Sequence, residues 1–254
     1  MGQELTGYTS PMHLILFDID GTLIRGHGLG RRALERAFGE VFGIRIDEHP
    51  GIGNVSFAGR TDPTILEAMA RVLRIPETAF RARHSEFEGA YCRHLRVTVA
   101  ESTEKEPCPG VPELLSRLHR HPRLALGLLT GNIEKGARIK LDPFGLNAYF
   151  PFGGFGSDHE DRSVLAARAL EIARARTGAP IHPGSVLVVG DTEHDVAAAK
   201  VNGFLAAGVV TGFGSRESMA SAGADAIFED LSPAHGFEAW LRERWDLDAV
   251  GVGG

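Results

Sequence analysis

The sequence has little of what marks several large classes of protein. Its 254 residues include only two cysteines, Cys92 and Cys108, which excludes a disulfide scaffold or a cysteine metal cluster and is typical of a reducing compartment. Basic residues do not exceed acidic ones, since 27 Lys and Arg stand against 33 Asp and Glu for a net charge of −6, so no basic face for nucleic acid is indicated. No apolar run reaches the roughly 20 residues that cross a bilayer, and residues 1–12 lack the basic and apolar regions of a signal peptide. We therefore expect a cytoplasmic protein with neither nucleic-acid nor membrane partners.

The residues that are present follow the pattern of an α/β protein. Hydrophobic residues make up 43% of the chain and charged residues 24%, which is ordinary for a globular protein with a real core. Short apolar runs predict strands at 14–17, 124–129, 186–189, 204–209 and 226–228. Helical patterns accompany them at 111–121, 132–141, 161–177, 192–202, 215–222 and 233–246. Strands that alternate with helices predict a Rossmann-like parallel sheet covered by helices.

The stretch between the predicted strands 14–17 and 124–129 breaks this alternation, because it contains no convincing strand. Amphipathic patterns at 31–42 and 64–74, and a third apolar stripe from Phe80 to Leu95, predict a small helical subdomain inserted into the α/β domain. Its hinges are expected near the glycine-rich segment 25–28 and the proline-containing segment 103–109. The predicted division is a core of 12–25 and 107–246, a helical insert of 26–106 and a flexible tail of 247–254.

Two aspartates follow the first predicted strand. In the segment LILFDIDGTLI, Asp18 and Asp20 come where the apolar run ends, and Gly21 permits a close turn. Two neighbouring carboxylates repel each other unless a cation or a shared proton relieves the repulsion. The motif therefore predicts a divalent-metal site, acid–base chemistry, or both.

Polar residues also follow two later strands. The strand at 124–129 runs into Thr130, Gly131 and Asn132 before a helix, which suits an anion cradle, although Asn132 also fits a helix cap. The strand at 186–189 runs into Asp191, with Asp195 four residues further on. Asp191 can face the same crevice as the first aspartates, or it can serve only as an N-cap.

A cation stands at the start of the helix expected at 161–177. Arg162 opposes the helix dipole there, so we expect an anionic group near it. The alternative is a solvated helix end that Asp161 caps. Because the carboxyl ends of parallel strands share one edge of the sheet, the acids, the Thr130 hydroxyl and the arginine are expected to meet. Together they are the groups that phosphoryl transfer needs.

Four segments carry a family resemblance. DIDGT, TGN, a basic residue before a helix and GDTEHD, in this order, resemble the four motifs of the haloacid dehalogenase-like (HAD) hydrolase superfamily. The helical insert resembles that family's cap domain of the C1 type, and Gly59-Arg60-Thr61-Asp62 resembles the cap loop of its phosphoglycolate phosphatase branch. The third motif departs from the family pattern, because most members have a lysine there, no lysine fits, and Arg162 stands in its place.

The resemblance implies a role for each matching residue. Asp18 is the nucleophile that becomes an aspartyl phosphate, and Asp20 is the general acid and base, with its backbone carbonyl bound to Mg²⁺. Asp191 completes the metal site with Asp18 and Asp20. Asp195 lies alongside Asp191, either as a direct metal ligand or as a residue that contacts a ligand. The residues that bind the phosphoryl group are Thr130, Gly131, Asn132 and Arg162.

We therefore expect a Mg²⁺-dependent phosphatase for a small phosphomonoester such as phosphoglycolate, so its partner is a small phosphorylated metabolite. Arg60 is expected to pair with the part of the substrate that is not phosphate, unless it packs on the cap and points to water. A sugar-phosphate mutase with the same motifs and a catalytically silent phosphate-binding protein are the alternatives. Neither the physiological substrate nor the oligomeric state is indicated.

Overall fold

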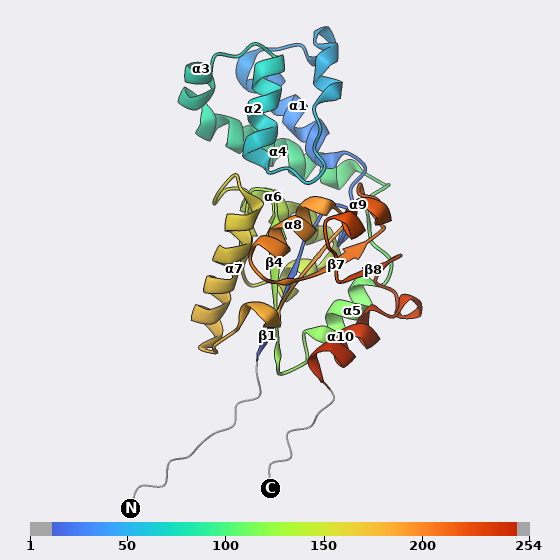
Figure 1. The fold of residues 1–254 in the computed structure, drawn as a ribbon. Coiled ribbons are helices and arrows are strands. Elements are labelled where there is room, and N and C mark those ends of the chain that lie inside the picture. Colours follow the sequence, from blue (N-terminus) through green and yellow to red (C-terminus); the bar gives the residue numbers. More distant parts are fainter. Residues whose placement is uncertain (1–11, 248–254) are drawn as a thin grey trace, which may run out of the picture.

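The computed structural model describes residues 12–247 and places a parallel sheet beneath a separate group of helices (Figure 1). The six-stranded sheet has the order β5-β4-β1-β6-β7-β8, and all neighbouring strands are parallel. Its strands are β1 (His13–Phe17), β4 (Leu124–Thr130), β5 (Gly153–Phe155), β6 (Val186–Gly190), β7 (Leu205–Val209) and β8 (Ala226–Phe228). The predicted α/β fold with a Rossmann-like sheet is confirmed.

Helices cover both faces of this sheet. Ile15 and Phe17 of β1 pack in one apolar cluster with α5 and α10, whereas Leu14 and Leu16 pack in another with α7, α8 and α9. Alternate residues of a strand point to opposite faces, so a strand buried on both needs an uninterrupted apolar run, which is the pattern that predicted β1. The helices are α5 (Val111–Leu118), α6 (Glu134–Leu141), α7 (Arg162–Thr177), α8 (Glu193–Val201), α9 (Arg216–Ser221) and α10 (Phe237–Trp245).

The inserted helices form the upper group in Figure 1. They are α1 (Leu29–Phe42), α2 (Asp62–Val72), α3 (Glu77–Ala82) and α4 (His84–Glu101), and we call this group the cap. Phe38, Phe42, Phe80 and Phe87 pack together at its centre, with ring centroids 4.5–6.3 Å apart. The single third helix that the apolar stripe predicted is therefore wrong, because the chain breaks at Arg83 into α3 and α4.

A two-stranded ribbon joins the cap to the sheet domain. Ile24–Arg25 (β2) pairs antiparallel with Glu106–Pro107 (β3), so the expectation of no strand in this region was wrong for these short segments. They were missed because two residues are too few to show a period. The proposed division at 25/26 and 106/107 stays a prediction, which the separate apolar cluster of the cap supports.

Some expectations concern the ends of the chain and its cysteines. Cys92 and Cys108 are free and buried, as expected from their spacing. Within 12–247, the longest apolar helices fall short of what a bilayer crossing requires. Residues 1–11 and 248–254 lie outside the described residues. The expectation for residues 1–12 therefore falls outside them except at Met12, and so does most of the tail predicted at 247–254. Leu247, the first residue of that tail, is buried against the core.

Candidate active site

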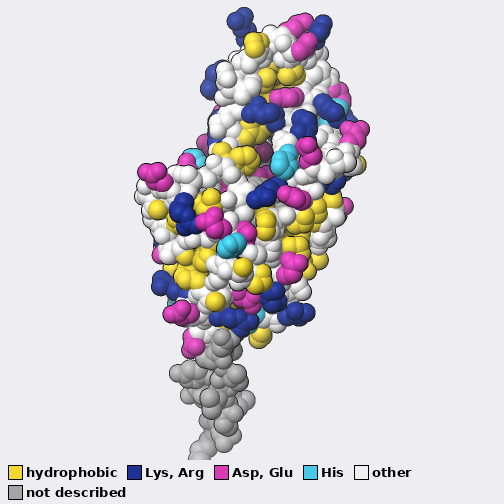
Figure 2. All heavy atoms as spheres, turned by 90° about the vertical axis from the view of Figure 1, so that its right-hand side faces the viewer, with side chains coloured by type: hydrophobic (Ala, Val, Ile, Leu, Met, Phe, Trp, Pro, Cys, Tyr) yellow, Lys and Arg dark blue, Asp and Glu magenta, His cyan; other side chains and the backbone are white. Residues whose placement is uncertain are grey.

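The predicted residues meet at the carboxyl end of the sheet. Asp18 directly follows β1, Thr130 ends β4 and Asp191 directly follows β6. All three line one cavity of about 600 Å³ that also touches Arg31 and Phe57 of the cap. On the face shown in Figure 2, Lys, Arg and His side chains border the hollow between the cap and the sheet domain. The strand-end argument therefore located the cavity correctly.

Three buried carboxylates lie together at its floor. One oxygen from each of Asp18, Asp191 and Asp195 lies within 4.8 Å of the others. Burial raises the pKa of Asp18 and of Asp191 above the usual range, and the charges of the neighbouring acids raise both pKa values further. A divalent cation prefers such oxygen ligands and would relieve this repulsion. The chemistry of the donor set therefore fits a hard metal ion.

A tight turn brings the first motif against this cluster. Gly21 has φ +86°, and a Cβ there would lie 2.5 Å from Oδ2 of Asp191 and 2.8 Å from Cα of Gly212. Only glycine fits such an approach at this φ. The predicted turn thus lets the backbone at Gly21 lie directly against the Asp191 carboxylate.

The acids after β6 have different surroundings. Oδ2 of Asp191 accepts a hydrogen bond of 2.6 Å from the Phe213 amide, and α8 is capped by Thr192, so the N-cap alternative for Asp191 was wrong. Asp195 completes a capping box, because its Oδ2 accepts from both the amide and the hydroxyl of Thr192. Its Oδ1 accepts from Arg162. Both oxygens of Asp195 therefore already have donors.

Arg162 lies at the first position of α7 and is buried. It forms ion pairs with Asp195 and, at 3.6 Å, with Oδ1 of Asp18. Burial opposes its charge, but the charges of Asp195, Asp18 and Asp191 outweigh burial and raise the pKa of Arg162. Asp161 caps the same helix through Ser163. The expected anionic group near Arg162 is therefore present, and of the alternative only the capping by Asp161 holds, because Arg162 is buried and not solvated.

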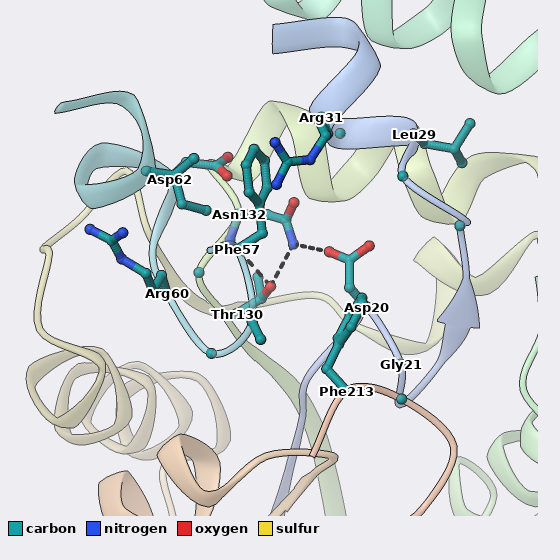
Figure 3. Close-up of a pocket in the computed structure, with 18 of the residues that line it drawn as sticks. Asp20, Gly21, Leu29, Arg31, Phe57, Arg60, Asp62, Thr130, Asn132 and Phe213 are labelled. Atoms are coloured by element: carbon teal, nitrogen blue, oxygen red, sulfur yellow. Dashed lines mark hydrogen bonds between the residues drawn. The ribbon is translucent and has the colours of Figure 1, made fainter. Parts of the chain in front are cut away.

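Asp20 belongs to a second polar cluster, drawn in part in Figure 3. Nδ2 of Asn132 donates to Oδ2 of Asp20 and to Oγ1 of Thr130, both at 2.8 Å, and α6 has no side-chain cap, so Asn132 is not its cap. Nζ of Lys140 also donates to Oδ2 of Asp20, at 2.6 Å. Burial alone would raise the pKa of Asp20, but the Lys140 charge and the bonds from Asn132 and Lys140 outweigh it and lower the pKa.

Sequence reasoning missed Lys140. It occupies α6, eight residues after Asn132, and is 5% exposed. No local signal marks it, because Asn132 precedes the start of α6 at Glu134 and so does not share a helix face with Lys140. It does not lie before a helix start, so Arg162 is still the basic residue that matches the third motif.

A loop of the cap docks on the core beside this cluster. The amide of Asp62 donates to the Gly131 carbonyl at 2.7 Å, and Oδ2 of Asp62 accepts from the Ile133 amide at 2.8 Å. The Thr61 hydroxyl donates to the Glu160 carbonyl at 3.1 Å. These bonds place Gly131 directly beneath the cap loop.

The two arginines of the cap differ in direction. Arg60 donates to the carbonyl of Thr64, within the cap, and Figure 3 shows its guanidinium pointing away from Asp20 and Thr130. Arg31 donates to two cap carbonyls and lies 4.2 Å from the ring centroid of Phe57, on the cavity wall. The expected role of Arg60 stays a prediction, and Arg31 is a cation over the cavity that the sequence analysis missed.

Comparison with known sequences gives one family. Residues 12–203 match the family model described as haloacid dehalogenase-like hydrolase. The chain is similar to the phosphoglycolate phosphatase of Synechococcus elongatus, with 35% identity over 124 residues, which cover 49% of this chain and 55% of that relative. It is similar to that of Photorhabdus laumondii with 25% identity over 219 residues, or 86% and 88% of the two chains. The first match thus spans only about half the relative's length.

Comparison with solved structures gives the same fold. CbbY from Rhodobacter sphaeroides in complex with phosphate matches with a TM-score of 0.64 and 21% identity, covering 87% of this chain and 95% of that one. A candidate β-phosphoglucomutase from Thermotoga maritima matches with a TM-score of 0.60 and 24% identity, covering 91% and 99%. At these identities the likeness concerns the fold.

Proposed function

Because this chain belongs to the haloacid dehalogenase-like hydrolase family, as its four motifs predicted, we propose that it is a Mg²⁺-dependent phosphatase acting on a small phosphomonoester. The observation that carries the proposal is one cavity in which Asp18 lies beside Arg162 and the acid cluster, with Asp20 and Thr130 on its wall. These groups provide a nucleophile, an anion-binding cation and an acid–base residue in one place.

The metal would be held by Asp18 and Asp191 together with the backbone carbonyl of Asp20. When bound, Mg²⁺ supplies positive charge that offsets the charge of the phosphoryl oxygens and of the buried acids. We place Asp195 behind this set, because its two oxygens accept hydrogen bonds from Arg162 and Thr192.

In the first step, a carboxylate oxygen of Asp18 attacks phosphorus. The bond from phosphorus to the leaving oxygen breaks, and that oxygen takes a proton from Asp20. Arg162 and the Thr130 hydroxyl stabilise the charge on the transferring group. The products are the alcohol and an aspartyl phosphate on Asp18.

In the second step, water attacks the phosphorus of the aspartyl phosphate. Asp20 accepts the proton of the water, the bond from phosphorus to Asp18 breaks, and inorganic phosphate leaves. Asp20 begins this step as the carboxylate, because it gave its proton to the leaving oxygen in the first step.

The cavity beneath the cap suggests which kind of alcohol is esterified to phosphate in the substrate. A cavity of about 600 Å³ suits a small metabolite, and a cation on its wall favours a second negative charge on the substrate. Phosphoglycolate, the substrate named for two similar proteins, has such a charge. Arg60 is the cation proposed from the cap loop, and Arg31 is the one whose guanidinium lies nearer the cavity.

The decisive experiment is a screen of purified protein against phosphomonoesters, with Mg²⁺ or with EDTA. We expect Mg²⁺-dependent release of phosphate, fastest for a short acidic substrate. If Arg60 or Arg31 selects that substrate, Arg60→Ala or Arg31→Ala, respectively, should raise KM for the acidic substrate alone. Conversion of one sugar phosphate into another would favour the mutase alternative. Binding of a phosphomonoester without turnover would favour the catalytically silent phosphate-binding protein. Cell fractionation tests the cytoplasmic placement, which we keep as part of the proposal.

A further inference from the structure

Lys140 is a buried ammonium in contact with the proposed acid–base residue. Its side chain is 6% exposed, and its Nζ donates to Oδ2 of Asp20 at 2.6 Å and to Oδ1 of Asn132 at 2.7 Å. Burying an ammonium is costly unless charged and polar partners compensate for the lost water. Lys140 has both partners, so its contact with Asp20 is a specific arrangement of the site.

Asn132 closes this contact into a ring. Its amide oxygen accepts from Lys140, while its amide nitrogen donates to Asp20 and to Thr130. Lys140 has only donors, so it fixes which end of the Asn132 amide faces Asp20. Figure 3 shows that amide between the Asp20 carboxylate and Thr130.

The ring treats the two oxygens of Asp20 differently. Oδ2 accepts from both Asn132 and Lys140, whereas within 12–247 no side chain or amide donates to Oδ1. The Asp20 side chain is 33% exposed and lines the cavity. One oxygen is therefore anchored, and the other remains available to a molecule in the cavity.

The cap closes over the ammonium. A Cβ placed on Gly30 of α1 would lie 3.4 Å from Nζ of Lys140 and 3.9 Å from the hydroxyl of Tyr91 on α4. That hydroxyl is buried and has no hydrogen-bond partner. Residues of the cap therefore lie close to the Lys140 ammonium, beside the cavity that Lys140 also lines.

We propose that Lys140 is a positioning residue for the reaction: it anchors Oδ2 of Asp20 so that Oδ1 faces the leaving-group oxygen. This inference rests on the proposed phosphatase function. Lys140 lines the cavity, but its Nζ donates to Oδ2 of Asp20 and to Oδ1 of Asn132, so we assign its effect to Asp20. Its effect is confined to the placement of the oxygen that gives up and takes back a proton, and misplacing such an oxygen slows the steps that need the proton.

The test compares the leaving-group dependence of kcat/KM in the wild type, Lys140→Met and Lys140→Arg. This constant covers only the steps up to formation of the phosphoenzyme, so later hydrolysis does not mask the effect. The matched control is Lys135→Met on the same helix, because Lys135 is 71% exposed and pairs with Glu88 instead. Thermal unfolding and the Mg²⁺ concentration for half-maximal rate are measured on every variant.

We expect Lys140→Met to lower kcat/KM for alkyl phosphates by about 100-fold and for nitrophenyl phosphate far less, with the Mg²⁺ requirement unchanged. Lys140→Arg should recover part of the alkyl rate, and Lys135→Met should match the wild type. A uniform loss on both substrates, or an unchanged dependence on the leaving group, would overturn the inference. If Lys140→Met does not fold, the same comparison with Lys140→Arg and Lys140→Gln decides, since Gln lacks the charge and should show the steeper dependence. A wild type that hydrolyses no phosphomonoester would remove the proposed function, and the inference with it.

Discussion

A single methyl group at Gly131 should separate the cap loop from the core. A Cβ on Gly131 would lie 2.2 Å from the carbonyl oxygen of Arg60 and 2.9 Å from Cα of Thr61. Both are backbone atoms, so no side-chain rotation relieves the clash. Ordinary contacts between carbon and a carbonyl oxygen are about 3.3 Å. In Gly131→Ala the loop must therefore retreat by about 1 Å.

The retreat weakens two hydrogen bonds. They join the Asp62 amide to the Gly131 carbonyl, at 2.7 Å, and the Ile133 amide to Oδ2 of Asp62, at 2.8 Å. Each such bond contributes about 0.5–1.5 kcal/mol net, so the docked loop loses about 1–3 kcal/mol. That energy corresponds to a decrease of about 5–150-fold in the docked population relative to the undocked one. If the docked loop completes the site, kcat/KM falls by less than this factor, because most molecules still have the loop docked, whereas the opening measured by hydrogen exchange rises by all of it.

The assay pairs two measurements on Gly131→Ala. One is kcat/KM for a small phosphomonoester with saturating Mg²⁺, and the other is amide hydrogen exchange of residues 57–62, which should speed up. Gly184→Ala is the control, because nothing lies within 4 Å of a Cβ there. A slower reaction with unchanged exchange would assign the loss to the phosphate site and refute the loop argument. Unchanged rate and exchange would refute it as well.

Four further outcomes are expected. Asp18→Asn should lower single-turnover phosphate release by several orders of magnitude, because no other group can form the phosphoenzyme. Asp191→Ala should raise the Mg²⁺ concentration for half-maximal rate, which a metal titration measures, because a ligand is lost. Arg162→Ala should lose about 3 kcal/mol of transition-state stabilisation, measured as a fall in kcat/KM of about 100-fold, and Arg162→Lys should recover part of it. Burial raises the pKa of Asp62 from 3.8 to about 6. A carboxyl that ionises less readily in the folded state destabilises the fold once charged, so unfolding free energy should fall by up to about 3 kcal/mol between pH 4 and 6, and urea unfolding of Asp62→Asn should lack this component.

Local pattern predicted the strands that are buried on both faces and failed for β5. The β1 and β6 runs are apolar throughout because helices cover both sides of the sheet, so burial and sequence agree. The β5 strand is Gly153–Phe155, with two glycines in three residues. It exists because β4 offers it hydrogen bonds, and Gly154 has no room for a side chain, since a Cβ there would lie 2.3 Å from the Leu165 carbonyl oxygen. Such a strand is set by its neighbours and leaves no local signal.

The same distinction holds for the candidate site. Asp18, Thr130 and Asp191 were predictable because each stands at the end of a strand, where the sheet alone fixes its place. Lys140 was not, because burial depends on how α6 lies against α1 and α4. Nothing within the sequence EKGARIKL indicates that the side chain of Lys140 is 6% exposed whereas that of Lys135 is 71% exposed. The difference lies in their partners, because Lys140 donates to Asp20 and Asn132 whereas Lys135 pairs with Glu88.

The contacts between cap and core also set how easily the cavity can open. Three hydrogen bonds tie the loop at Thr61 and Asp62 to the core, through the carbonyls of Glu160 and Gly131 and the amide of Ile133. At about 0.5–1.5 kcal/mol each, they favour the docked loop by about 1.5–4.5 kcal/mol, or roughly 10- to 1000-fold. Since the aromatic cluster inside the cap consists of residues outside this loop, opening of the loop needs no unfolding of the cap. The docked and open loop positions are therefore separated by a thermally accessible free energy, and the hydrogen bonds among Asp20, Asn132 and Lys140 involve no residue of the loop.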